Sequence, residues 1–281
     1  MRVSVIAAFY KDIVALKLII DALRQQDYDD FELVVAEDNN DPKITDFLNS
    51  VTGIDIVHTT QDDIGIRKAR SQNNAIIAST GEYLIFIDAD CIPYRSFISS
   101  HAMLAKKGEV LSGRRVNLGP RISSFLRKHF LKSTTIERFF LLFAPILILD
   151  GATHMVQGLF FKPDSFIYRN IISKRKKSNT NLLGCNFSCF KEDMLTIDGF
   201  DEYYLGESCL SDDTDLEWRF KACGFKLKPC KMSANIFHLY HGLRPHQPID
   251  SEAELSKMMA RKKLQNYVSE TGISSHKTRS N

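Results

Sequence analysis

The sequence predicts an α/β protein with a mostly parallel sheet and helices on both of its faces. In the first hundred residues, segments rich in Val and Ile alternate with segments whose apolar residues recur at helical spacing. This alternation of strand and helix is typical of parallel sheets. A chain of 281 residues, of which 44% are hydrophobic and 25% charged, can bury the core of one large or two small domains.

Four strands and three helices are expected in this half of the chain. The strands lie at residues 2–9, 31–38, 54–60 and 83–90, and the helices at 12–26, 42–51 and 65–80. Pro42 can open the second helix and Gly81 stops the third. Acidic residues follow three of the strands, namely Glu37-Asp38, Asp62-Asp63 and Asp88-Asp90. Ligands of such sheets bind beyond the carboxyl ends of the strands, so these acids indicate a binding edge.

Residues 119–180 differ from this pattern because they mix lysines and arginines with large apolar side chains. The longest apolar run, FFLLFAPILIL at 139–149, contains Pro145 and is much shorter than the roughly 20 residues that a membrane span requires. Two interpretations stay open. The segment is either a helical subdomain with a solvated basic face or a surface that meets anionic lipid. Further on, 250–270 predicts a closing helix, and the last residues predict a loose tail.

The net charge, the N-terminal sequence and the cysteine spacing argue against several classes of protein. The formal net charge of +3 gives no case for nucleic acid as a partner. The N-terminus begins a strand almost at once and shows no pattern of a signal peptide. The six cysteines form no CxxC pair, which makes a zinc ribbon improbable and favours reduced thiols in a cytosolic protein.

A possible metal site begins at YLIFIDADCIP, where Asp88 and Asp90 end an apolar strand. Mg²⁺ and Mn²⁺ take oxygen ligands, and alternation along a strand would place both carboxylates on one side. The alternative is a strand that simply reaches water. His238 and His241, in FHLYH, are either structural or complete such a site.

Other polar residues carry two interpretations each. Asp38 could accept a hydrogen bond from a nucleotide base or cap a turn. Arg67, after Gly65 and at the start of a helix, could meet a phosphate or remain solvated. Asp212, Asp213 and Asp215 open another helix, and three carboxylates exceed what a helix cap needs, so one could act as a general base.

Taken in order, these segments resemble the inverting, GT-A-fold glycosyltransferases of family 2, in the branch with a galactosyltransferase-like C-terminal region. ELVVAEDNN is similar to the family's EIIVVDDGS, and DDIGIRKARSQNNAI to the branch's EDxGFRxAxARNxAI. GEYLIFIDADCIP resembles GDYLVFLDGDCVP, and LLGCNFSCFKEDMLTIDGFDE resembles GCNMSFWRxDLLxVNGFDE. DDTDLEWRFKACGFK and FHLYH are similar to EDxDLxxRLxxxGxR and FHLWH. The resemblance implies a Rossmann-like GT-A sheet, mixed but mostly parallel, with a basic and apolar helical insert.

The resemblance implies a set of residues that bind a UDP-sugar. Asp38 would accept from the uracil ring, and Arg67 and Asn73 would line the nucleotide. Asp88 would contact the ribose or the donor sugar. The pattern also implies a pocket for donor sugar and acceptor that includes Asn186, Gly206 and Asp212.

The resemblance also implies a metal and a catalytic base. Asp90 would ligate Mn²⁺ (or Mg²⁺), with His238 or His241 as the second protein ligand. Asp213 would take the proton from an acceptor hydroxyl while that oxygen attacks the anomeric carbon opposite UDP, so an α-linked donor would give a β-glycoside.

Four regions follow from this resemblance. Residues 1–100 are expected to bind the nucleotide sugar, 101–180 to form the connection with the helical and possibly membrane-facing insert, 181–245 to hold the acceptor and the base, and 246–281 to form the C-terminal helix and tail. The implied function is synthesis of a surface polysaccharide or lipopolysaccharide on a glycan or lipid-linked acceptor. The expected location is cytoplasmic and peripheral, on the inner face of the cytoplasmic membrane. The alternative is a non-catalytic nucleotide-sugar binder or a membrane-associated scaffold, which needs no base.

Overall fold

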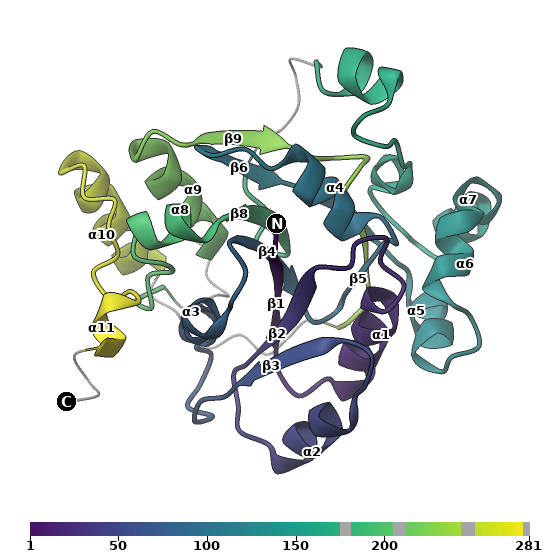
Figure 1. Cartoon of the computed structure of the whole chain (residues 1–281), viewed down its shortest axis with the longest axis horizontal. Coiled ribbons are helices and arrows are strands. Elements are labelled where there is room, and N and C mark those ends of the chain that lie inside the picture. The colour runs from purple at the N-terminus through teal and green to yellow at the C-terminus, as the bar shows by residue number, and fades with distance from the viewer. Residues whose placement is uncertain (175–180, 205–211, 243–250, 278–281) are drawn as a thin grey trace.

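The centre of the protein is a seven-stranded sheet in the order β3-β2-β1-β4-β8-β6-β9 (Figure 1). This computed structural model describes residues 1–174, 181–204, 212–242 and 251–277. The strands of the sheet are β1 (Val3–Phe9), β2 (Phe31–Glu37), β3 (Asp55–Thr59), β4 (Tyr83–Asp88), β6 (Glu109–Ser112), β8 (Asn186–Phe190) and β9 (Lys226–Pro229).

The first four strands run parallel to one another, as their sequence predicts. Between them lie α1 (Ile13–Leu23), α2 (Pro42–Ser50) and α3 (Lys68–Ala78). Alternate residues of β1 point to opposite faces of the sheet: Val5 packs in the same core cluster as Leu16 of α1, whereas Ile6 packs in that of Ile76 of α3. Both faces are therefore covered, which explains why these strands read as unbroken apolar runs.

The second half of the chain extends the same sheet. β8 lies between β4 and β6 and runs antiparallel to both, and β9 pairs parallel with β6. Around them lie α4 (Phe97–Leu104), α8 (Lys191–Thr196) and α9 (Asp212–Ala222). The α/β fold with a mixed, mostly parallel sheet is confirmed.

A second, three-stranded sheet has the order β5-β10-β7. It consists of β5 (Cys91–Pro93), β7 (Arg114–Asn117) and β10 (Asn235–His238). β10 runs antiparallel to β5, which directly follows the acidic end of β4, and parallel to β7. Residues separated by almost 150 positions in sequence thus become neighbours.

A buried polar network joins the two sheets at Asn186. The amide nitrogen of Asn186 donates to the carbonyls of Arg114 and Ala234, each at 2.9 Å, and its oxygen lies 3.1 Å from Nε2 of His101. A Cβ at Gly113 would stand 2.2 Å from the Asn186 side chain, so only glycine leaves room for it.

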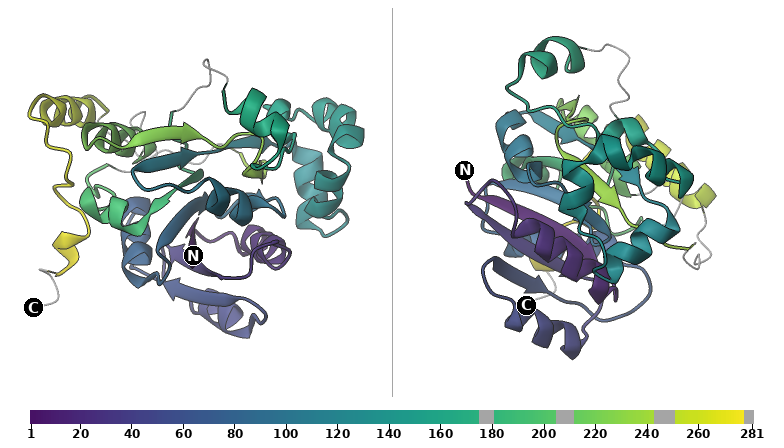
Figure 2. Two further views of the ribbon diagram at one scale, coloured as in Figure 1. Left: turned by 45° about the horizontal axis from the view of Figure 1, so that its top comes forward. Right: turned by 90° about the vertical axis from the view of Figure 1, so that its right-hand side faces the viewer.

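The insert contains α5 (Pro120–Arg127), α6 (Ser133–Arg138), α7 (Phe140–Leu149), the short 3₁₀ helix η1 (Met155–Gly158) and the π-helix η2 (Tyr168–Ile172). Helices α5 to α7 form one edge of the molecule, opposite α10 (Ser251–Lys263) and α11 (Ser274–Lys277) (Figures 1 and 2). Across the described ranges, no helix has both the length and the apolar character needed to cross a bilayer.

Candidate active site

The two aspartates of the DAD segment occupy different settings. β4 ends at Asp88, and Ala89 and Asp90 form a turn before β5. The alternation expected along one continuous strand therefore does not govern this pair. Asp88 lies 2.8 Å from Nζ of Lys68, whereas both oxygens of Asp90 face histidines.

Strand pairing brings the FHLYH segment onto the DAD turn. In the antiparallel pair of β10 and β5, His238 stands directly opposite Cys91, and the Leu239 amide donates to the carbonyl of Asp90 at 2.9 Å. His241 follows three residues later in the loop after β10. The geometry of this ladder places both imidazoles beside Asp90.

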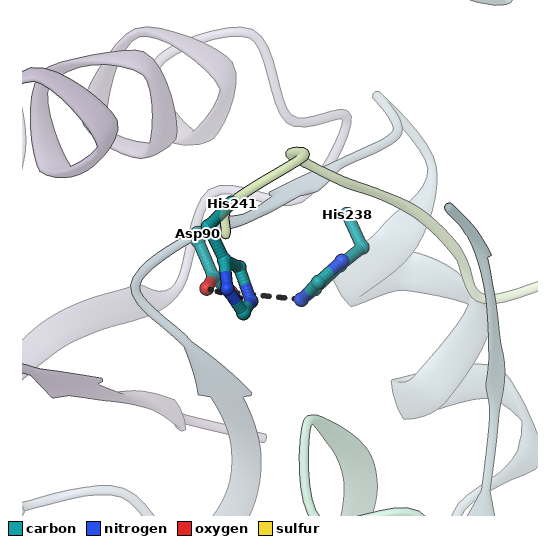
Figure 3. Close-up of side chains that lie close together, drawn as sticks. All are labelled: Asp90, His238 and His241. Atoms are coloured by element: carbon teal, nitrogen blue, oxygen red, sulfur yellow. Dashed lines mark ion pairs between the residues drawn. The ribbon is translucent and has the colours of Figure 1, made fainter. Parts of the chain in front are cut away.

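Asp90, His238 and His241 form a triad whose ligand atoms all lie within 4.8 Å of one another. Nε2 of His238 is 3.6 Å from one carboxylate oxygen of Asp90, and Nε2 of His241 is 3.6 Å from the other. Figure 3 shows the two rings turned toward the carboxylate. These separations exceed hydrogen-bond length, and they suit three ligands around one divalent ion with bonds of about 2 Å. The two imidazoles of this donor set suit a divalent first-row transition metal, and the carboxylate suits Mn²⁺ among these metals.

The protonation of the two histidines favours ligation. Burial lowers the pKa of His238, and the positive charge of Arg115 adds to this effect, which exceeds the opposing effect of Asp90. A neutral imidazole is the form that binds a metal. Nδ1 of His241 lies 2.9 Å from the carbonyl of Gly242, and a ring with its proton on Nδ1 would present Nε2 to the triad as a ligand atom.

Two cations that the sequence interpretation missed stand beside Asp88. Burial raises the pKa of Asp88, but the positive charges of Lys68 and Arg115 outweigh it and hold the pKa below its usual value. Arg115 lies on β7, and its guanidinium is 3.1 Å from Sγ of Cys185. A basic residue beside the DAD segment could have been sought at the start of α3, but nothing in the sequence near Arg115 indicates this place.

Asp38 accepts hydrogen bonds from the segment that leads into α3. Its carboxylate accepts from the backbone amide of Arg67 at 2.7 Å and from Nε2 of Gln61 at 2.6 Å. The side chain of Arg67 turns back to the carbonyl of Asp62. Asp38 is nearly buried, and each of its oxygens keeps a second lone pair for a further donor.

Two of the residues predicted to contact a ligand have their amides hydrogen-bonded inside the protein. Asn73 is fully buried, and its amide both donates to and accepts from the backbone of Phe200, each at 2.9 Å. Asn186 is equally buried, and its amide nitrogen donates to backbone carbonyls in the network between the two sheets. These polar atoms are satisfied inside the protein, and contact of either asparagine with a ligand stays a prediction.

The acidic start of α9 separates into two roles. Asp213 is partly exposed, and one of its oxygens accepts from the Gly184 amide at 3.1 Å. Asp215 is buried and bonds to Arg219 and Trp218. Asp213 is therefore the member of this pair that faces outward as the expected base. The side chain of Asp212, and the whole of Gly206, lie outside the described residues.

The chain belongs to glycosyl transferase family 2, whose family model matches residues 4–161. Among curated proteins none matches the sequence. The matched range includes β1 to β4, Asp38 and the DAD turn.

Solved structures share the GT-A fold at low sequence identity. The S. aureus TarS 1–349 structure in complex with UDP superimposes with a TM-score of 0.60 at 13% identity, covering 94% of this chain and 66% of that one. The mannosyltransferase PcManGT from Pyrobaculum calidifontis, in complex with GDP-Man and Mn²⁺, has a TM-score of 0.51 at 15% identity and covers 94% and 62%. A longer S. aureus TarS structure has a TM-score of 0.54 at 14% identity, and the match covers 85% of this chain but spans only 37% of TarS.

Proposed function

We propose that the protein is a metal-dependent inverting glycosyltransferase that moves a sugar from a UDP-sugar to a hydroxyl of a glycan or lipid-linked glycan. The observation that carries this proposal is the convergence of Asp90, His238 and His241 at the carboxyl edge of the sheet. A bound Mn²⁺ or Mg²⁺ would supply Lewis-acid stabilisation of the departing diphosphate. The presence of UDP in one structural neighbour, and of GDP-Man with Mn²⁺ in another, supports a nucleotide-sugar donor.

The protein's own residues would divide the remaining work. Asp38, already fixed by Gln61 and the Arg67 amide, would accept from the nucleobase. Asp213 would accept the proton of the attacking hydroxyl. Lys68 and Arg115 lower the pKa of Asp88 and would add positive charge for the diphosphate of the donor. We further propose that the reaction belongs to surface polysaccharide or lipopolysaccharide synthesis and takes place at the cytoplasmic face of the membrane.

The test is release of UDP from a panel of UDP-sugars with Mn²⁺, with Mg²⁺ and with EDTA. We expect turnover with at least one donor and its loss in EDTA. Asp213→Asn should bind UDP and Mn²⁺ as the parent does, measured by thermal shift, yet turn over about 10²–10⁴-fold more slowly. The exposed Asp46→Asn is the matched control.

Two outcomes would contradict the proposal. Binding of nucleotide sugars without any turnover, including in the presence of candidate acceptors, would favour the non-catalytic binder. Unchanged turnover by Asp213→Asn would contradict the assignment of Asp213 as the general base. The anomeric configuration of the product, measured by NMR, tests inversion separately.

A further inference from the structure

Helix α7 is apolar on all sides and yet lies largely in solvent. Of its ten residues, FLLFAPILIL, only Phe140 and Leu147 are buried, seven positions apart on one stripe of the helix. The outward side chains include Leu141 at 72% exposure, Leu142 at 75% and Leu149 at 88%. An apolar helix is normally covered by protein or lipid, so this exposure indicates a partner.

The neighbouring helices enlarge this surface. We call it the α5–α7 face, and it comprises the exposed apolar residues Phe125, Phe130, Phe139, Leu141, Leu142, Ile146, Ile148 and Leu149. These helices lie together at one edge of the molecule (Figure 2). One phenylalanine and two leucines, Phe130, Leu142 and Leu149, are each at least 75% exposed, which is more than scattered surface residues explain.

Positive charge surrounds the α5–α7 face. Residues 119–150 contain five lysines and arginines and two acidic residues. Both acids point inward: Glu137 accepts from the Arg95 amide, and Asp150 accepts from the first amides of α5. Exposed basic side chains at Arg121, Lys128, Lys132 and Arg138 are therefore not offset by neighbouring carboxylates of the same segment.

The length of α7 decides how it could meet a membrane. Ten residues rise about 15 Å, half the roughly 30 Å of a bilayer's hydrocarbon layer. Pro145 also has no amide for the carbonyl one turn before it, which is tolerable at the headgroup boundary but costly in the hydrocarbon centre. The helix suits a position parallel to the membrane, with its side chains at the interface.

This face is joined directly to the active site. The Leu118 amide, just before α5, donates to the carbonyl of His238 at 2.9 Å. The Tyr240 amide, between the two histidines of the triad, donates to Oγ of Ser123 in α5 at 2.8 Å. A membrane bound at the α5–α7 face would therefore hold the site at the lipid surface.

We propose that the α5–α7 face docks the protein on a bilayer of anionic phospholipid, with the leucines and phenylalanines entering the interface and the basic residues meeting the headgroups. The docking surface does not depend on the proposed transferase reaction. Its test is a binding measurement that needs neither donor nor metal.

The experiment is co-sedimentation of the full chain with vesicles of phosphatidylcholine alone or with 30% phosphatidylglycerol. The wild type should pellet with the anionic vesicles and far less with the neutral ones. Lys128→Glu/Lys132→Glu should weaken this binding by about tenfold or more, because each basic group near the surface contributes several-fold. Leu141→Ser/Leu142→Ser/Leu149→Ser should weaken it to a similar degree while the melting temperature stays near that of the parent, since these side chains are exposed.

Matched controls change the same residue types elsewhere. Lys43→Glu/Lys226→Glu and Met259→Ser/Leu264→Ser alter exposed positions outside the insert and should leave binding unchanged. Equal pelleting by the two insert variants and the wild type, or no pelleting of the wild type, would overturn the proposal. So would a concentration-dependent dimer, seen by light scattering without vesicles, that the serine variant abolishes, because the face would then be a contact between two copies.

Discussion

Two clusters of charged residues in this protein are built on opposite principles. The first is the triad of Asp90, His238 and His241, in which the carboxylate and imidazoles stand 3.6 Å apart. The second, which we call the balanced cluster, contains Asp201, Asp215, Arg219 and Arg261, and every member is at most 3% exposed.

The balanced cluster is a closed set of charges. Arg219 and Asp215 pair at 2.6 Å, and Arg261 and Asp201 also pair at 2.6 Å. Asp215 accepts in addition from the indole of Trp218 at 2.9 Å. Burial raises the pKa of Asp201, but hydrogen bonds from the Tyr203 amide and Thr271, with the charge of Arg261, outweigh it and lower that pKa.

The difference teaches how to distinguish a structural carboxylate from a functional one. Two acids and two arginines at hydrogen-bond distance leave no charge over, so the balanced cluster fastens α10 to α9 and to the loop before it. In the triad, gaps longer than hydrogen bonds separate groups that all can ligate a cation. The balanced cluster should therefore determine stability, and the triad should determine metal binding and activity.

Asp90→Asn is expected to have the largest effect of the changes considered. An amide ligates divalent ions more weakly than a carboxylate, so the rise in melting temperature on adding Mn²⁺ should disappear. Sugar transfer should fall by about 10³-fold or more, because the metal contributes several kcal/mol to the transition state. The melting temperature without metal should stay close to the parent value. A variant that keeps its Mn²⁺-induced shift would break the distinction between the clusters.

The sequence predicted the members of the triad but not those of the balanced cluster. The triad follows from acidic and histidine residues at strand ends, where parallel strands gather their functional groups. Asp213 and Asp215 are two residues apart on a helix, roughly 200° around its axis, so only one of them can face outward. Asp215 turns inward to Arg219, four residues on in the same helix, and to Arg261, which comes from a helix far along the chain and carries no local signal.

The hydrogen-bond partners of the two asparagines could not be predicted for a related reason. Asn73 and Asn186 match positions of a ligand-binding pattern, yet both have their amides directed to backbone groups inside the protein. A sequence shows that a polar residue is present but not whether its partner is a ligand or a neighbouring loop. The strands themselves were predictable because burial on both faces leaves an unbroken apolar run.

Asp215→Asn tests the other side of the comparison. Loss of the charge leaves Arg219 buried without its partner, and the free energy of unfolding should fall by about 3–5 kcal/mol, measured by urea denaturation. Protein that remains folded should still show the Mn²⁺-induced rise in melting temperature.

Asp55→Asn is the control for this change. Asp55 pairs with Arg2 at 3.1 Å but is 70% exposed, so its replacement should cost less than about 1 kcal/mol. Equal costs at Asp55 and Asp215 would mean that the balanced cluster contributes nothing beyond a surface pair.

The smallest predicted effect concerns the protonation of His101, which lies in the core, away from the histidines of the triad. Nδ1 of His101 is 2.8 Å from Oγ of Ser188, which is also 2.7 Å from the hydroxyl of Tyr83. The amide oxygen of Asn186 can only accept, so Nε2 carries the proton and Nδ1 accepts from Ser188. Burial lowers the pKa of His101 to about 3. A second proton on the ring would place a positive charge in the fully buried core.

The consequence is a pH dependence of stability with a definite sign. Between about pH 3 and 6.5 the unfolded chain binds a proton at His101 that the native protein does not, so the free energy of unfolding rises with pH, by at most about 1.4 kcal/mol per unit. In urea titrations His101→Gln should reduce this slope by nearly one proton at pH 5 and by about half a proton at pH 6.5. His129→Asn, exposed and in a left-handed backbone conformation that asparagine also adopts, should leave it unchanged. If both variants kept the parent slope, His101 would be protonated in the native core, and the polar network around Asn186 would need a different arrangement of protons.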